Sequence, residues 1–468
     1  MNFLDKAISL VSDALYTYIL IFLLVAAGIF FTVKSRFVQF RLLGEQLRAV
    51  TEKPKDKGKV SSFQALIVST ASRVGTGNII GVSAALCLGG FGSVFWMWLI
   101  ALIGAASAFV ESVLAQLYKR KSGSGCVGGP AYYIETALKS RALAIAFTVC
   151  LILTYGFGFN MLASYNLQST FAGYAFYNPS VTPWVIGGIL AVLVAICLFG
   201  GGKRVIQVSG ILVPIMGVVY ILVALLLTLL NITALPGVLG RIFAEAFNLP
   251  AVFGGISGSC LMYGIRRGLF SNEAGVGSAP NASASAEVSH PVKQGLSQIL
   301  SVFIDTLLVC SATAFMCMMS GIEPSAALEG APYVQAALSA TLGDFGPIFI
   351  TVAMIFFAFT TLLGNLYYVD QAWFFLFKKE PSKTFLTVYR LVASAVIFVG
   401  AGLSAGLLWD IADVTMGLMA LINVPVIVYL SKYAFRALKD YERQRKEGKD
   451  PTFKAADIDL PRQTDYWN

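Results

Sequence analysis

The chain has 468 residues, of which 57% are hydrophobic and only 13% are charged. Soluble domains carry about 25% charged residues, so this composition excludes an ordinary soluble protein and predicts an all-α polytopic membrane protein. The formal net charge of +9 gathers in connections between apolar segments, so we expect no nucleic-acid partner.

The apolar segments predict 11 transmembrane helices. A span of about 30 Å of hydrocarbon needs roughly 20 apolar residues. The first segment follows a polar start without a small-residue cleavage site, so we expect a retained helix and no signal peptide. The segments lie at 14–33, 62–88, 93–117, 143–176, 183–200, 205–230, 250–286, 296–320, 346–377, 384–405 and 408–431.

Lys and Arg favour alternate connections between these helices. Eight fall between the first two helices, from Lys34 to Lys59, and nine fall in the tail from Lys432 to Arg462. Connections on the opposite side carry only Lys6 and Arg241. The positive-inside rule therefore predicts a multi-pass plasma (inner) membrane protein with its N-terminus outside and its C-terminus in the cytoplasm.

The pattern divides the chain into four parts. We expect an N-terminal helix with a basic cytoplasmic linker over 1–60 and a first helical unit over 61–230. A second unit follows over 241–431, and residues 432–468 form a cytoplasmic tail. Within the tail, the stretch from Lys432 to Lys449 reads as a basic helix end at the membrane surface, followed by a solvated segment.

The second helix is interrupted by glycine. Gly75, Gly77 and Gly81 surround Thr76 and Asn78 within an apolar segment, and glycine weakens helix interiors. Backbone groups freed at membrane depth are tolerated only where they line a cavity or meet a ligand. This stretch is a candidate binding site.

The third and fourth helices add buried polar groups. Glu111 lies deep in the third helix and should face the bundle and find a partner. Asn160, Ser164 and Gln168 recur every four residues in the fourth helix, which places them on one face. The stripe can line a substrate path, or it can serve hydrogen bonding between helices.

The segment 250–286 repeats the theme of the second helix. Its 37 residues would form a helix of about 55 Å, too long for one span without a break or tilt. We place an interruption between Gly264 and Gly277, where the polar residues Asn272 and Glu273 also lie.

Counting five helices from each interrupted one gives two units, helices 2–6 and 7–11. Because five is odd, the second unit is inserted upside down relative to the first. Paired broken helices in two inverted halves indicate a secondary transporter with its site near the bilayer midplane. Glycines that serve only close helix packing are the alternative.

The ninth helix offers oxygen ligands to a cation. Thr361 and Asn365 share a face one turn apart, and the adjacent hydroxyls of Thr360 and Thr361 can supply two oxygens to a hard cation. Asp305 in the eighth helix is a further buried acid. Beside the two breaks lie Arg73 and Glu273, which we expect to pair as a cytoplasmic gate.

The sequence resembles the alanine/glycine:cation symporter family, also called sodium:alanine symporters, within the amino acid, polyamine and organocation superfamily. Matching motifs extend over most of the chain. They are 75–82 (GTGNIIGV), 89–90 (GG) with 95–98 (FWMW), 128–134 (GGPAYYI), 266–275 (RRGLFSNEAG), 277–280 (GSAP) and 367–368 (YY).

This resemblance implies a leucine-transporter-type core of two inverted five-helix repeats behind one extra N-terminal helix. It also implies sodium-coupled symport of a small neutral amino acid of the alanine or glycine type into the cell, by alternating access, with sodium as coupling ion and no enzymatic cofactor. No oligomeric state follows from it.

The family analogy also names site residues. Thr360 and Thr361 would join the backbone near Gly75 around sodium. One departure from the family pattern concerns Asn365. Many members carry Trp at this position, directly after the glycine of the ninth helix, and the absence of that aromatic side chain would enlarge or polarise the pocket. The amino acid would be bound by Gly75, Thr76, Gly77, Asn78, Gln168, Phe270, Asn272, Thr361 and Asn365.

Three other functions compete. An intramembrane serine protease would use Ser257 in a G-x-S-G pattern with His290, the single histidine, as base, but the topology separates the two. A cation channel usually repeats its pore-lining groups, whereas here there is one asymmetric pair of breaks. A proton-coupled symporter of another amino acid, such as a larger polar one, would use Glu111, Glu273 or Asp305.

Overall fold

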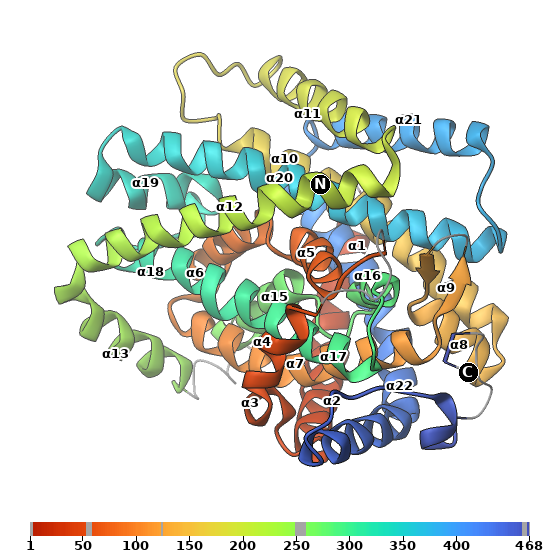
Figure 1. Ribbon diagram of the computed structural model, residues 1–468. Helices are drawn as coiled ribbons and strands as arrows, with labels where there is room; N and C mark the ends of the chain where they lie inside the picture. Colours follow the sequence, from red (N-terminus) through yellow and green to blue (C-terminus); the bar gives the residue numbers. More distant parts are fainter. Residues whose placement is uncertain (1–2, 53–58, 123–124, 249–258, 461–465, 468) are drawn as a thin grey trace.

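The computed structural model is a bundle of helices that describes residues 3–52, 59–122, 125–248, 259–460, 466 and 467 (Figure 1). Within this part, eight continuous helical segments are long and apolar enough to cross a membrane. They are Asp5–Lys34, Gly92–Leu117, Arg141–Ser169, Gly201–Leu230, Pro291–Met318, Phe345–Phe377, Lys383–Gly400 and Ala405–Lys446.

Three of these long segments contain a π-helical turn between two α-helices, and the other five are single α-helices. A π-turn is wider than an α-turn and often marks a functional site. The elements are α1 (Phe3–Leu15), η1 (Tyr16–Leu20), α2 (Ile21–Lys34), α7 (Gly92–Leu117), α9 (Arg141–Leu151), η3 (Ile152–Gly158), α10 (Phe159–Ser169), α12 (Gly201–Leu230), α17 (Pro291–Val302), η6 (Phe303–Cys310), α18 (Ser311–Met318), α20 (Phe345–Phe377), α21 (Lys383–Gly400) and α22 (Ala405–Lys446).

The other three predicted spans are shorter or broken. One is α11 (Thr182–Leu198), which lies beside α21 at the top of Figure 1. The second is the interrupted run α5 (Ser62–Arg73), η2 (Gly77–Gly81) and α6 (Val82–Gly89), and the third contains α15 (Cys260–Asn272) and α16 (Ala279–Ser285). The number of 11 spans and the inverted repeat therefore stay predictions.

The first break follows from local sequence. A capping box starts α5, in which Ser61 Oγ accepts from the Gln64 backbone N–H and Gln64 Oε1 accepts from that of Ser61. The helix ends where Val74 leaves helical geometry, with ψ 89°. Helical geometry resumes at Thr76, just before the π-turn that begins at Gly77, so the chain is open over 74–75.

The second break lies at 273–278, at the end of the predicted window. Glu273 ends α15 with φ +52°, and Gly275 and Gly277 follow with φ +86° and +94°. Positive φ is readily accessible only to glycine. Residues 254, 255, 257 and 258 of the same predicted segment lie outside the described residues.

Small elements complete the fold. An antiparallel pair of strands, β1 (Arg120–Ser122) and β2 (Gly125–Val127), joins Lys121 to Cys126 in register. The remaining elements are α3 (Val38–Arg41), α4 (Leu43–Val50), α8 (Pro130–Leu138), η4 (Ile232–Ala234), α13 (Leu235–Ala246), η7 (Ala326–Leu328), α19 (Ala331–Leu342) and η8 (Ala455–Ile458).

The expectation of a solvated C-terminal tail is wrong. Three side chains of the tail are at most 6% exposed: Phe453, Leu460 and Trp467. The Trp467 indole N–H donates to the Gln116 carbonyl at 2.7 Å, and Lys119 Nζ lies 3.8 Å from the Tyr466 ring centroid. The aromatic residues of the tail therefore pack against the end of α7, a contact that the charge pattern of the sequence does not indicate.

Candidate binding site

The two broken helices meet at Gly77 and Phe270. A Cβ on Gly77 would lie 2.9 Å from the Phe270 ring, so only glycine fits beneath that ring. Phe270 also contacts Phe159 and Trp409, with ring centroids 4.6 and 4.8 Å away. These three rings cover one side of the break.

Asn78 closes the first break and connects it to Asp305. Its Oδ1 accepts from the Gly75 backbone N–H at 2.7 Å, and its Nδ2 donates to Asp305 Oδ1 at 2.7 Å. The other carboxylate oxygen of Asp305 accepts from Ser271 Oγ at 2.8 Å. Asp305, on η6, thus links both broken helices.

Our site prediction did not include Asp305 or Ser271. The signal for Asp305 was present, since an acid at membrane depth is by default a functional candidate. Ser271 gave no separate signal, because one more serine in a small-residue stretch is typical of membrane helices.

The two threonines of α20 face different ways. A Cβ on Gly75 would stand 1.9 Å from Thr361 Oγ1, so this hydroxyl lies directly against the first break, and it is buried without a hydrogen-bond partner among the described residues. Thr360 Oγ1 instead donates to the Phe356 carbonyl at 2.9 Å and lies 3.5 Å from Met216 Sδ. Adjacent helical residues point about 100° apart. The Thr361 hydroxyl therefore faces Gly75, and the Thr360 hydroxyl points away from it.

Asn365 bridges three helices. Its Oδ1 accepts from Ser72 Oγ at 2.7 Å, and its Nδ2 donates to Asn160 Oδ1 at 3.0 Å. Ser72 lies on α5 next to the first break, and Asn160 belongs to the predicted polar stripe of α10. The amide at position 365 therefore gives this wall a polar network.

Of the remaining predicted site residues, Thr76 and Asn272 lie at the two breaks, whereas Gln168 does not face the site. Thr76 Oγ1 accepts from Asn166 Nδ2 at 3.1 Å, which ties the first break to α10. Gln168 is turned away, because its Oε1 accepts from Tyr177 at 3.0 Å. Asn272 is fully buried beside the second break; its Oδ1 accepts from the Ala274 N–H, and its Nδ2 has no partner in the described structure.

Arg73 and Glu273 do not form the expected ion pair. Arg73 Nη1 donates to Gln298 at 2.9 Å, while the Glu273 carboxylate accepts from Ser72 at 3.3 Å and from Ser278 at 2.6 Å. Nε and Nη2 of Arg73 have no hydrogen-bond partner among the described residues.

Glu111 has the partners that its depth required. It accepts from the Gly275 backbone N–H at 3.3 Å and from Asn423 Nδ2 at 3.0 Å. Asn423 Nδ2 also reaches the Gly275 carbonyl at 2.9 Å. Through these contacts α7 and α22 hold the second break open.

A charged network lies on the side of the aromatic cover. Arg266 Nε donates to Asp413 at 2.6 Å, and the same guanidinium contacts Asp13 of α1 and Asp410. Arg267 lies 3.9 Å from the Trp409 ring centroid. The network ties α1, α15 and α22 together over the site.

The site therefore combines exposed backbone ends with buried polar atoms that have no protein partner in the described structure. Those atoms include Thr361 Oγ1, Asn272 Nδ2, Asn160 Nδ2 and Ser164 Oγ. A half-helix start suits a carboxylate, and orphan carbonyls suit an ammonium or a cation. Of the two residues of the protease alternative, Ser257 lies outside the described residues, and the His290 ring binds Asp440 at the start of α17.

Broken helices that meet inside a bundle define a membrane transport protein. Comparison with solved structures agrees on the fold: MhsT in complex with L-phenylalanine superposes with a TM-score of 0.51 at 13% identity, covering 86% of this chain and 93% of that one. The family model described as the sodium:alanine symporter family matches residues 1–455. The chain belongs to this family.

Similar curated proteins include two from Bacillus subtilis. The amino-acid carrier protein AlsT is 45% identical over 466 residues, covering 100% of this chain and 98% of AlsT. The probable sodium/glutamine symporter GlnT is 44% identical, covering 96% of this chain and 93% of GlnT. The protein is thus a multi-pass membrane transporter of an amino-acid symport family and not an enzyme.

Proposed function

We propose that the protein carries a small neutral amino acid of the alanine or glycine type into the cell together with sodium, by alternating access. The observation that supports this most directly is the open backbone at 74–75, with the Thr361 hydroxyl against Gly75. In this proposal the protein lies in the plasma membrane with its N-terminus outside.

Each end of the break has a role. The backbone N–H of Gly77 at the start of η2 would hold the substrate carboxylate, since that of Asn78 already donates to the Gly75 carbonyl at 3.1 Å. The carbonyls that end α5, together with Thr361 Oγ1, would hold sodium, a hard cation that prefers oxygen ligands. Thr360 is left out of this set because its hydroxyl faces Met216.

Coupling would follow from shared structure. Gly75 lies against Thr361 on one side and is bonded to Asn78 on the other, so ion and substrate would order the same loop. Two ligands that favour one conformation strengthen each other's binding reciprocally, typically by about 1 to 3 kcal/mol.

A larger polar amino acid, such as one with a side-chain amide, is the second candidate substrate. Asn365 in place of an aromatic residue, and the unpartnered Nδ2 of the neighbouring Asn160, favour it. Proton coupling is the alternative to sodium, since Asp305 and Glu273 lie at the breaks.

The test is uptake into proteoliposomes that hold the purified protein. A panel of labelled amino acids is offered under an imposed sodium gradient, an imposed proton gradient, or neither. We expect saturable accumulation of alanine or glycine driven by sodium. Accumulation of glutamine instead would favour the second candidate substrate. Uptake driven by the proton gradient would show that the coupling ion is the proton and not sodium. Sodium flux that does not saturate would contradict a carrier.

A further inference from the structure

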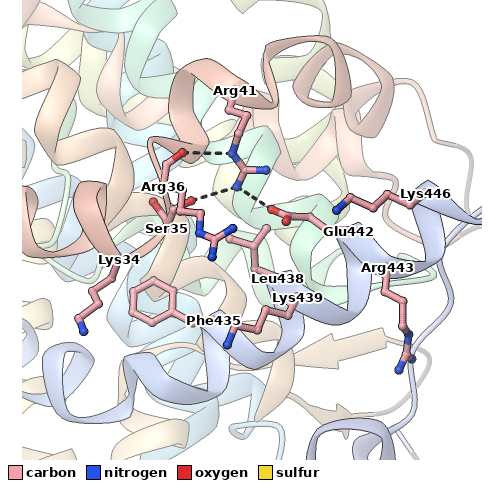
Figure 2. Close-up of a pocket in the computed structure, with 10 residues that line it drawn as sticks. All are labelled: Lys34, Ser35, Arg36, Arg41, Phe435, Leu438, Lys439, Glu442, Arg443 and Lys446. Carbon is pink, nitrogen blue, oxygen red and sulfur yellow. Dashed lines mark hydrogen bonds and ion pairs between the residues drawn. The ribbon is translucent and has the colours of Figure 1, made fainter.

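A basic pocket of about 380 Å³ lies apart from the broken helices, between the end of α2, α3 and the last turns of α22 (Figure 2). Its lining contains a single carboxylate, that of Glu442. The cationic side chains around it are Lys34, Arg36, Arg41, Lys439, Arg443 and Lys446.

Only some of these charges are compensated. Arg41 is fixed by Glu442 at 2.6 Å and by the Arg36 and Ser35 carbonyls at 3.1 Å, as Figure 2 shows. Arg443 pairs with Asp440. The side chains of Lys34, Arg36, Lys439 and Lys446 have no hydrogen bond or ion pair to any described residue. The pocket thus holds uncompensated positive charge around a rigid Arg41–Glu442 link.

The pocket has apolar surroundings that a soluble anion would not need. Phe435 and Leu438 line its interior. Beside it lie four apolar residues that are each at least 50% exposed: Phe37, which precedes α3, and Phe40, Leu43 and Leu47 of α3 and α4. Leu43 and Leu47 share one face of α4, while Gln46 and Ala49 of the same helix are buried.

Its place in the fold is the boundary of a membrane. The candidate span Asp5–Lys34 ends in the pocket at Lys34, and the span Ala405–Lys446 passes beside it. A surface helix with exposed apolar and basic residues lies in the interfacial plane, which sets the pocket at head-group level.

We infer that this pocket binds the phosphodiester of an anionic glycerophospholipid, with the acyl chains against the exposed face of α3 and α4. Basic pockets beside membrane helices attract anionic head groups, and the apolar surroundings select a lipid over free phosphate. The bound lipid links α2 and α3 to the end of α22. This site is separate from the transport site and does not depend on which solute is carried.

The experiment titrates the purified full-length protein in detergent with phosphatidylglycerol and follows its thermal unfolding midpoint. The test variant is Lys34→Gln/Arg36→Gln/Lys439→Gln. The matched control is Lys378→Gln/Lys379→Gln/Lys383→Gln, which removes three charges at the connection between α20 and α21, outside the pocket. A charge-keeping variant, Lys34→Arg/Lys439→Arg, checks that the change tested is charge.

We expect phosphatidylglycerol to raise the unfolding midpoint of the wild type, the control and the charge-keeping variant at similar concentrations. The test variant should need at least about tenfold more lipid for the same shift, because it lacks three basic residues and each one near a membrane surface adds about fivefold in affinity. Phosphatidylcholine and inorganic phosphate should have little effect.

Three outcomes overturn the inference. An equal lipid response in the test variant shows that these charges do not bind the lipid. An equal effect of phosphatidylcholine shows that the head-group charge is irrelevant. Saturation by inorganic phosphate alone assigns the pocket to a free anion. Should the test variant unfold without lipid, the single variants Lys34→Gln and Lys439→Gln are titrated instead, with the same criteria.

Discussion

Two adjacent threonines of α20 offer a matched pair of substitutions. Thr361→Val removes the hydroxyl that lies against Gly75, whereas Thr360→Val removes one that bonds within its own helix. A polar contact to a charged group contributes about 1.5 to 3 kcal/mol, so the sodium concentration for half-maximal uptake should rise roughly tenfold to a hundredfold in Thr361→Val. Thr360→Val should stay close to wild type, and an equal effect of both would contradict the site.

A second residue prediction concerns Gly75. In Gly75→Ala the new Cβ would meet Thr361 Oγ1 at 1.9 Å, so the open loop must shift and we expect uptake to fall below about a tenth of wild type. Gly210→Ala on α12 is the control, since nothing lies within 4 Å of its Cβ, and alanine favours a helix. Measured uptake at equal protein content compares the two.

At this scale the sequence was informative about backbone and less so about side chains. Clustered glycine predicts both breaks for two different reasons. At the second break, Gly275 and Gly277 have positive φ. At the first, a Cβ on Gly75 or Gly77 would collide with a neighbouring side chain. Clustered glycine does not reveal which hydroxyl of Thr360 and Thr361 turns inward, since that depends on the rotation of α20. The orientation of the Gln168 side chain likewise depends on its hydrogen bond with Tyr177, nine residues later in the chain.

Among the elements, the C-terminal half of α22 and the tail are held to α17 around His290. The His290 ring bonds Asp440 at 3.3 Å and stacks edge-on against Tyr441 and Phe453. Burial outweighs the Asp440 partner and lowers the pKa of His290 below its ordinary value of 6.5. The folded protein therefore favours the neutral ring.

This lowered pKa gives a pH dependence with a definite sign. The unfolded state binds a proton at higher pH than the folded state, so stability is full above about pH 6.5 and decreases as pH falls toward the folded pKa. We expect His290→Asn to lose stability at all pH values but to flatten this slope between about pH 5 and pH 7. Thermal unfolding in detergent across that range measures it, and an unchanged slope would refute the role of His290.

The tail also shows what composition hides. Charged residues from Lys432 onward suggest a solvated segment, yet Phe453 and Trp467 anchor it. Isolated aromatic residues carry no periodic pattern, so only the folded surface of α7 and α17 explains their burial. The same holds for α4, whose apolar and polar residues mix within a basic linker.

For the molecule as a whole, the network around Asp413 joins the N-terminal helix to the core. Asp413→Ala leaves Arg267 and part of Arg266 buried without their partner, and breaking a buried pair costs about 3 to 5 kcal/mol. We expect a lower unfolding midpoint in detergent. Asp344→Ala, at an exposed position, should change stability by less than about 0.5 kcal/mol, and equal midpoints for both variants would contradict this assignment.

The helix α22 runs without interruption for 42 residues, about 63 Å. One end carries Asp413 above the transport site, and the other carries Asp440 against His290. Asn423 holds α22 near its middle, and Pro425, two residues later, removes one hydrogen bond from the helical ladder there. The half of α22 that carries Asp413 and the half that carries Asp440 therefore join beside the second break, at the point where the helix bends most readily.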